Sequence, residues 1–132
     1  MSFLLDTNIC SAHLKNVAIV TSRLLQYTGR LHISTITLGE LYAWALRAKA
    51  PPRRMQSLLD LLNDLTVLDV DVDVARRFGE VQANLLDTGL RPPGLDLVIA
   101  STALVHGLTL VTHNTKDFAH VPGLILEDWL VP

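Results

Sequence analysis

Short apolar runs alternate along the chain with longer segments in which apolar residues recur every three or four positions. A short apolar run between polar or turn-forming residues is typical of a buried strand, and the longer spacing is typical of a helix that buries one face. Five such runs predict strands, at residues 3–5, 31–34, 66–70, 108–111 and 124–126.

Helices are predicted between these strands. They begin near Ile9, span 18–27, begin at Thr37, carry Pro52 in a first turn, span 74–86 and begin at Asp96. Gly29 and Gly107 are expected to end helices, because glycine accepts the left-handed conformation found there. Parallel strands need helical crossovers of this length, so the pattern predicts an α/β fold with a mostly parallel sheet of four or five strands, covered on both faces.

The composition fits a single domain covering residues 1–132. Apolar residues make up 49% and charged residues 18%, which is enough to build a core. The net charge of −2 disfavours a broad basic surface for nucleic acid, although a local basic patch stays open. Cys10 is the one cysteine, which excludes a disulfide within the chain and a cysteine metal cluster. We see no membrane span or signal peptide, so we expect a cytoplasmic protein.

Oxygen-bearing side chains lie near the predicted strand ends. Asp6 follows the first strand, and Glu40 lies in the helix after the second. Asp96 lies in the first turn of the helix that leads to the fourth strand, Asn114 follows that strand, and Asp117 comes three residues later. Ligand sites in parallel sheets lie at the carboxyl ends of the strands, so these groups are expected to converge at one edge.

Carboxylates that converge repel one another unless a cation compensates for their charge. Hard divalent ions such as Mg²⁺, with Mn²⁺ as a substitute, prefer oxygen ligands. An ion held in this way can activate a nucleophile and stabilise a charged phosphoryl transition state. The pattern therefore points to metal-assisted chemistry on a phosphate ester.

Each acidic residue also has an ordinary structural interpretation. Asp6 suits a helix N-cap, and Thr37 with Glu40 has the spacing of a capping box. Asp96 suits the positive end of its own helix, and the two residues after the fourth strand suit a turn. The functional interpretation rests on their joint placement.

The alternating acidic residues from position 69 onward could be interpreted as a calcium-binding loop. Asp69, Asp71, Asp73 and Glu80 have part of a calcium-loop spacing, but Val74 stands where that loop needs glycine. Asp71 or Asp73 is therefore expected to cap a helix.

The five histidines show no zinc pattern, and His113, close to the predicted site, suits either a turn or a contact with a phosphate.

Four cations flank two prolines at the junction of two predicted helices. They suit either a solvated helix end or a patch that contacts phosphate or a protein partner. These cations are Arg47, Lys49, Arg53 and Arg54.

Several motifs in this order resemble the PIN-domain ribonucleases, and specifically the VapC toxins of bacterial type II toxin–antitoxin systems. The ending VPGLILEDW (121–129) also looks like this group. The other matching motifs are FLLDTN (3–8), ISTITLGEL (33–41), DLVIA (96–100) and LVTHNTKDF (110–118).

The resemblance implies a PIN-like three-layer α/β/α fold and a Mg²⁺-dependent endoribonuclease. Asp6, Glu40 and Asp96 match the family's three acidic metal-site positions. Asn114 matches the fourth catalytic position, where an amide keeps an oxygen but loses a charge, so we expect one firmly held ion. Thr7, Asn8 and Thr112 match polar positions that support the acidic site in the family.

The resemblance also implies partners: an RNA substrate, with tRNA as our first expectation, a cognate antitoxin, and a second copy in a homodimer. We expect the antitoxin to place an Arg among the three carboxylates. Two alternatives stay open. One is a catalytically silent PIN-like module that binds RNA or protein. The other is a receiver-like or phosphatase-like aspartyl-phosphate domain, which the D-T-N at residues 6–8 disfavours because that class needs an acidic pair or D-x-D.

Overall fold

Five parallel strands form one sheet in the computed structural model, which describes residues 1–132. Their order across the sheet is β3-β2-β1-β4-β5. The strands are β1 (Phe3–Leu5), β2 (Leu31–Ser34), β3 (Thr66–Leu68), β4 (Thr109–Val111) and β5 (Leu126–Glu127).

Seven helices connect and cover these strands. The predicted helices are all present, and a four-residue helix before β5 is an addition that the apolar pattern did not predict. The helices are α1 (Thr7–Leu14), α2 (Ala18–Gln26), α3 (Thr35–Ala45), α4 (Arg53–Leu62), α5 (Val72–Asp87), α6 (Gly94–His106) and α7 (Thr115–Phe118).

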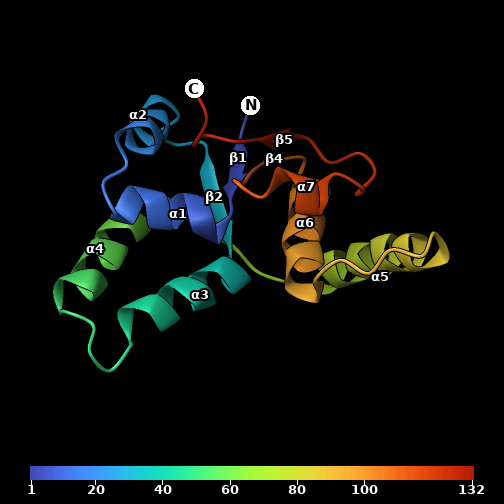
Figure 1. The fold of residues 1–132 in the computed structure, drawn as a ribbon, viewed down its shortest axis with the longest axis horizontal. Helices are drawn as coiled ribbons and strands as arrows, with labels where there is room; N and C mark the ends of the chain where they lie inside the picture. The colour runs from blue at the N-terminus through green and yellow to red at the C-terminus, as the bar shows by residue number, and fades with distance from the viewer.

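The sheet separates two hydrophobic cores. Phe3 and Leu5 of β1 pack with α1–α4, whereas Leu4 between them packs with α5, α6 and α7. Successive strand residues point to opposite faces, so one three-residue strand contributes to both cores. Figure 1 shows α1–α4 on one side of the sheet and α5–α7 on the other. The three-layer α/β/α fold is therefore confirmed.

Polar side chains that follow or end strands cap the N-termini of three helices. Asp6 caps α1, Ser34 caps α3 by accepting from the backbone N–H of Thr37, and Asp71 caps α5. Helix α3 thus begins two residues earlier than predicted, and the capping box of Thr37 with Glu40 is wrong because Thr37 is already inside the helix. The predicted cap at Asp71 is confirmed, and the helix that follows leaves no calcium loop.

Three further element boundaries can be compared with the predictions. Gly107 adopts φ +64° at the end of α6, as predicted, and Pro52 stands at the N-cap of α4 rather than in its first turn. Strand β5 begins two residues later than expected.

An aromatic cluster of Phe3, Tyr27 and Trp129 packs the C-terminal segment against the sheet. Trp129 is 1% exposed, and its ring lies 5.1 Å from that of Phe3 and 5.6 Å from that of Tyr27. The two chain ends consequently lie near each other in Figure 1. None of the seven helices is long and apolar enough to span a membrane.

Candidate active site

Asp6 is the buried centre of the site. It follows β1 directly and is 6% exposed. One carboxylate oxygen accepts a hydrogen bond from the backbone N–H of Thr7 at 2.8 Å, and the other accepts from the hydroxyl of Thr112 at 2.8 Å. The N-cap interpretation of Asp6 is thus correct, and it leaves the second oxygen in a network that joins β1 to the end of β4.

This network continues through Asn8 and the segment after β4. The Asn8 amide nitrogen lies 3.4 Å from Asp6 Oδ2, and the Asn8 amide oxygen accepts from the backbone N–H of His113 at 3.1 Å. Thr112 Oγ1 accepts from the backbone N–H of Asn114 at 3.1 Å. The Asn8 and Thr112 side chains are therefore each held by a second partner, which restrains the carboxylate.

Glu40 reaches the same edge of the sheet from α3. Its carboxylate accepts a hydrogen bond from Thr7 Oγ1 at 2.6 Å, across 33 residues of sequence. The residue is exposed, so its carboxylate faces solvent as well as Thr7. The contact joins α3 to the start of α1 and places a second carboxylate beside Asp6.

Asp96, in the first turn of α6, completes an acidic cluster. Burial raises the pKa of Asp96, and the negative charges of Asp6, Asp117 and Glu40 raise it further. Burial likewise raises the pKa of Asp6, the hydrogen bonds from Thr112 and Thr7 oppose that rise, and the charges of Glu40 and Asp117 add to it. The four carboxylates therefore interact electrostatically at one edge of the sheet.

Asp117 belongs to this cluster, as its position near the end of the fourth predicted strand indicated, although the sequence assigned it no catalytic or metal-binding role. It lies in α7, the helix that the apolar pattern did not predict, three residues after Asn114. The amide of Asn114 itself does not cap α7, and only its backbone N–H is bonded to the network. The signal in the sequence was the acidic residue within the same LVTHNTKDF motif.

No protein cation offsets these charges. The ion pairs of the chain are Arg76 with Glu80 and His113 with Asp128, and neither includes a carboxylate of the cluster. His113 Nδ1 lies 3.0 Å from the largely buried carboxylate of Asp128, which sequence analysis had not singled out. As they stand, no three His, Cys, Asp or Glu side chains are grouped closely enough to enclose a metal ion.

Comparisons with known proteins give the family. A PIN domain matches residues 3–124. The chain is similar to the tRNA(fMet)-specific endonuclease VapC of Shigella flexneri, with 39% identity over 131 residues and 98% of each chain covered. It is also similar to chains in two solved complexes. One is DNA-bound VapBC from Salmonella typhimurium, with a TM-score of 0.91, 36% identity and 98% of each chain covered. The other is VapBC2 from Rickettsia felis bound to a DNA fragment from its promoter, with a TM-score of 0.89, 32% identity and coverage of 98% of this chain and 99% of that one.

Proposed function

The chain belongs to the VapC group of PIN-domain ribonucleases, and on that premise we propose that it is a Mg²⁺-dependent endoribonuclease that cleaves tRNA as the toxin of a toxin–antitoxin pair. The observation that carries this proposal is the acidic cluster of Asp6, Glu40, Asp96 and Asp117, which lies at the carboxyl edge of a parallel sheet without a protein cation.

The donor set fits a hard divalent ion. Asp6 and Asp96 carry raised pKa values because burial and neighbouring carboxylates disfavour their charge, and a cation would relieve both costs. Mg²⁺ keeps several waters and needs only one or two carboxylates from the protein, so it does not require three enclosing ligands. Asp6 and Asp96 would hold the ion, with Glu40 and Asp117 beside it.

When bound, such an ion would supply Lewis acidity that activates water and offsets charge on the scissile phosphate. The residues of the chain do the positioning. Thr112 and the backbone N–H of Thr7 hold the Asp6 carboxylate in one orientation, and Thr7 Oγ1 holds Glu40. Glu40 is exposed and accepts only one hydrogen bond, which leaves it free to orient a water or accept its proton. Asn114, as the fourth catalytic position, would add a neutral oxygen at the rim.

The proposed substrate is tRNA. The similar Shigella flexneri protein is named a tRNA(fMet)-specific endonuclease, and the match covers 98% of each chain. Initiator tRNA is therefore the first substrate to test. On the same ground we propose that the protein acts in the cytoplasm.

We further propose a cognate antitoxin and a homodimer. The two solved complexes that contain similar chains are VapBC assemblies. In each of them the similar chain is paired with a second protein. An inhibitor that places an Arg among Asp6, Glu40 and Asp96 would pair with the carboxylates and exclude the metal ion and RNA together. Co-expression of the small protein encoded beside this one, with and without its C-terminal segment, tests that arrangement.

Cleavage of purified tRNA tests the function itself. We expect 5′-end mapping to give one dominant cut in Mg²⁺, no cut in excess chelator, and recovery on adding Mg²⁺ or Mn²⁺. Asp96→Asn is expected to abolish cleavage with the fold intact. Binding of RNA without any cleavage by the wild-type chain would instead establish a silent binding module, and cleavage that persists in chelator would exclude the metal mechanism.

A further inference from the structure

A second polar surface lies beyond the acidic cluster, at the junction of α3 and α4. Four of the eleven Lys and Arg residues lie between positions 47 and 54, and no Asp or Glu occurs from position 41 to position 59. On a chain with net charge −2, such a segment concentrates positive charge in one place.

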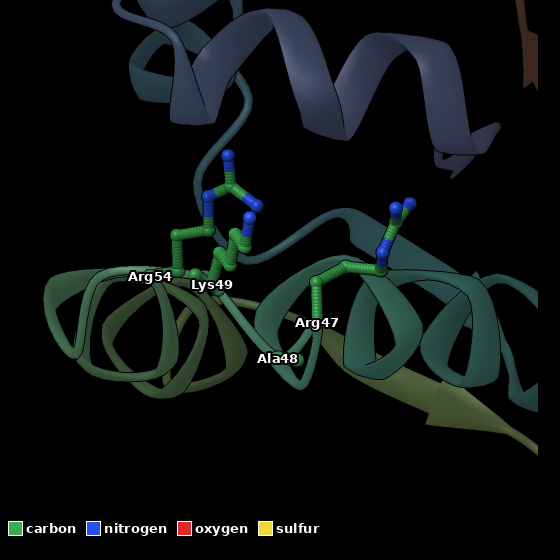
Figure 2. A pocket seen from close by; sticks show the side chains of 5 residues that line it. Arg47, Ala48, Lys49 and Arg54 are labelled. Atoms are coloured by element: carbon green, nitrogen blue, oxygen red, sulfur yellow. The ribbon is translucent and has the colours of Figure 1, made fainter.

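Three of the four cations line a cavity of about 540 Å³ that is formed by Arg47, Ala48, Lys49, Ala50 and Arg54. Figure 2 shows the side chains of Arg47, Lys49 and Arg54 extending from the α3–α4 junction on the same side, toward α1. We call this cavity the basic pocket. A neighbouring cavity of about 440 Å³ shares Arg54 and adds Lys15 and Arg53.

Arg54 is held in place within the basic pocket. One guanidinium nitrogen donates to the backbone carbonyl of Trp44 at 3.2 Å, and the guanidinium lies 5.1 Å from the centre of the Trp44 ring. These contacts restrain the side chain before any ligand arrives. They use one N–H, and a guanidinium has further donors in the planar fork that suits phosphate oxygens.

The remaining cations are free of acidic partners. Arg47, Lys49 and Arg53 are exposed, and none of the four cations takes part in an ion pair. Neither cavity has an acidic residue in its lining. Neighbouring like charges repel, and an anion with several charges relieves that repulsion at each of them.

We propose that the basic pocket is a binding site for RNA backbone phosphates, separate from the carboxylates that act on the scissile bond. This inference rests on the proposed ribonuclease function. Glu40 lies five residues before the end of α3 at Ala45, which corresponds to roughly 8 Å along the helix, and Arg47 follows two residues after that end. A strand whose scissile phosphate lies at the acidic cluster therefore has further phosphates within reach of the pocket. The attraction between those phosphates and the cations of the pocket offsets the repulsion that the acidic cluster exerts on RNA.

The favoured ligand is RNA rather than an acidic protein segment, because the pocket begins just beyond the C-terminal end of the helix that carries Glu40 and the substrate carries a phosphate at every nucleotide. The test uses the exposed pair, Arg47→Gln with Lys49→Gln, which leaves the Arg54–Trp44 contact in place. Its matched control is Arg76→Gln with Arg77→Gln on α5, which removes the same charge away from both cavities. Binding of fluorescent initiator tRNA is followed by anisotropy in excess chelator over a series of salt concentrations.

Loss of two phosphate contacts should lower the slope of log affinity against log salt by roughly 1.4–1.8 and weaken binding at low salt by about tenfold. In cleavage assays with Mg²⁺, the same variant should have a higher KM and a nearly unchanged kcat. The α5 control should keep the wild-type slope.

An unchanged salt slope in the Arg47 and Lys49 variant overturns the inference, whether or not the wild-type chain cleaves RNA. If that variant keeps its RNA affinity but escapes inhibition by the antitoxin, the basic pocket is a protein interface and the inference is likewise wrong. Failure of the wild-type chain to cleave any RNA would contradict the proposed function instead, and the salt titration would still report whether the pocket takes RNA.

Discussion

Thr112 and Asp6 are 106 residues apart in sequence, yet the Thr112 hydroxyl donates to Asp6 Oδ2 at 2.8 Å. The two residues follow the adjacent parallel strands β4 and β1, whose carboxyl ends meet. This hydrogen bond is the largest influence that opposes the rise in the pKa of Asp6 caused by burial. It therefore favours the charged form of a buried carboxylate.

Thr112→Val should remove this support while preserving the shape of the side chain. The buried Asp6 carboxylate loses a donor, and we expect a cost of about 1–3 kcal/mol in the free energy of unfolding. The pKa of Asp6 should rise further, so the acidic limb of the cleavage rate against pH should move to higher pH. Thr112→Ser keeps the hydroxyl and should retain the wild-type profile. An identical acidic limb in the valine variant would show that this bond does not control the carboxylate.

Asp96→Asn should change the pH dependence of stability when no divalent ion is present. The pKa of Asp96 in the folded protein lies above 3.8, the ordinary value, because burial and three neighbouring carboxylates disfavour its charge. The folded chain therefore binds more protons than the unfolded chain in the window just above pH 3.8, and stability falls as pH rises through it.

The amide in Asp96→Asn cannot ionise, so this variant should be the more stable chain at neutral pH and should lose that advantage below about pH 4. Thermal unfolding of both chains in chelator across this range is the measurement. A variant less stable than the wild type at neutral pH would contradict the repulsion on which the proposed metal site depends.

Addition of Mg²⁺ should reverse the order of stability. An ion that binds only the folded wild-type chain stabilises it by about 2.7 kcal/mol at one hundred times the dissociation constant. Asp96→Asn should gain much less, because it lacks one of the two proposed ligands. The readout is the shift in Tm with Mg²⁺ concentration and needs no RNA. Equal shifts in the two chains would remove Asp96 from the metal site.

Asp117→Asn should lower cleavage by roughly 10–100-fold, the usual effect of removing a group that supports a metal site. Its charge acts on both Asp6 and Asp96, although it lies in a helix of only four residues. Lys116→Gln changes the adjacent exposed position of α7 and should leave the rate near that of the wild type. Comparable rates for the two variants would assign Asp117 to the surface rather than to the site.

The sequence by itself determined the elements and the edge of the sheet on which the chemistry lies. Strands β1 and β2 have the predicted bounds, because each is an apolar run that a polar residue or helix cap ends. Gly107 ends α6 for a reason that is equally local, its positive φ. Parallel strands align their carboxyl ends, so the convergence of the carboxylates followed from the order of elements before any distance was known.

Only the tertiary structure decided how these elements meet. Nothing in the local pattern distinguishes a Glu40 that caps its own helix from one that accepts a hydrogen bond from Thr7, 33 residues away. Likewise, the contact of Arg54 with Trp44 depends on where whole elements pack. The spacing of apolar residues indicates which face of a helix or strand is buried. The partners of a polar side chain are set by the positions of other elements, because hydrogen bonds and charge interactions act over a few ångströms in space whatever the separation along the chain.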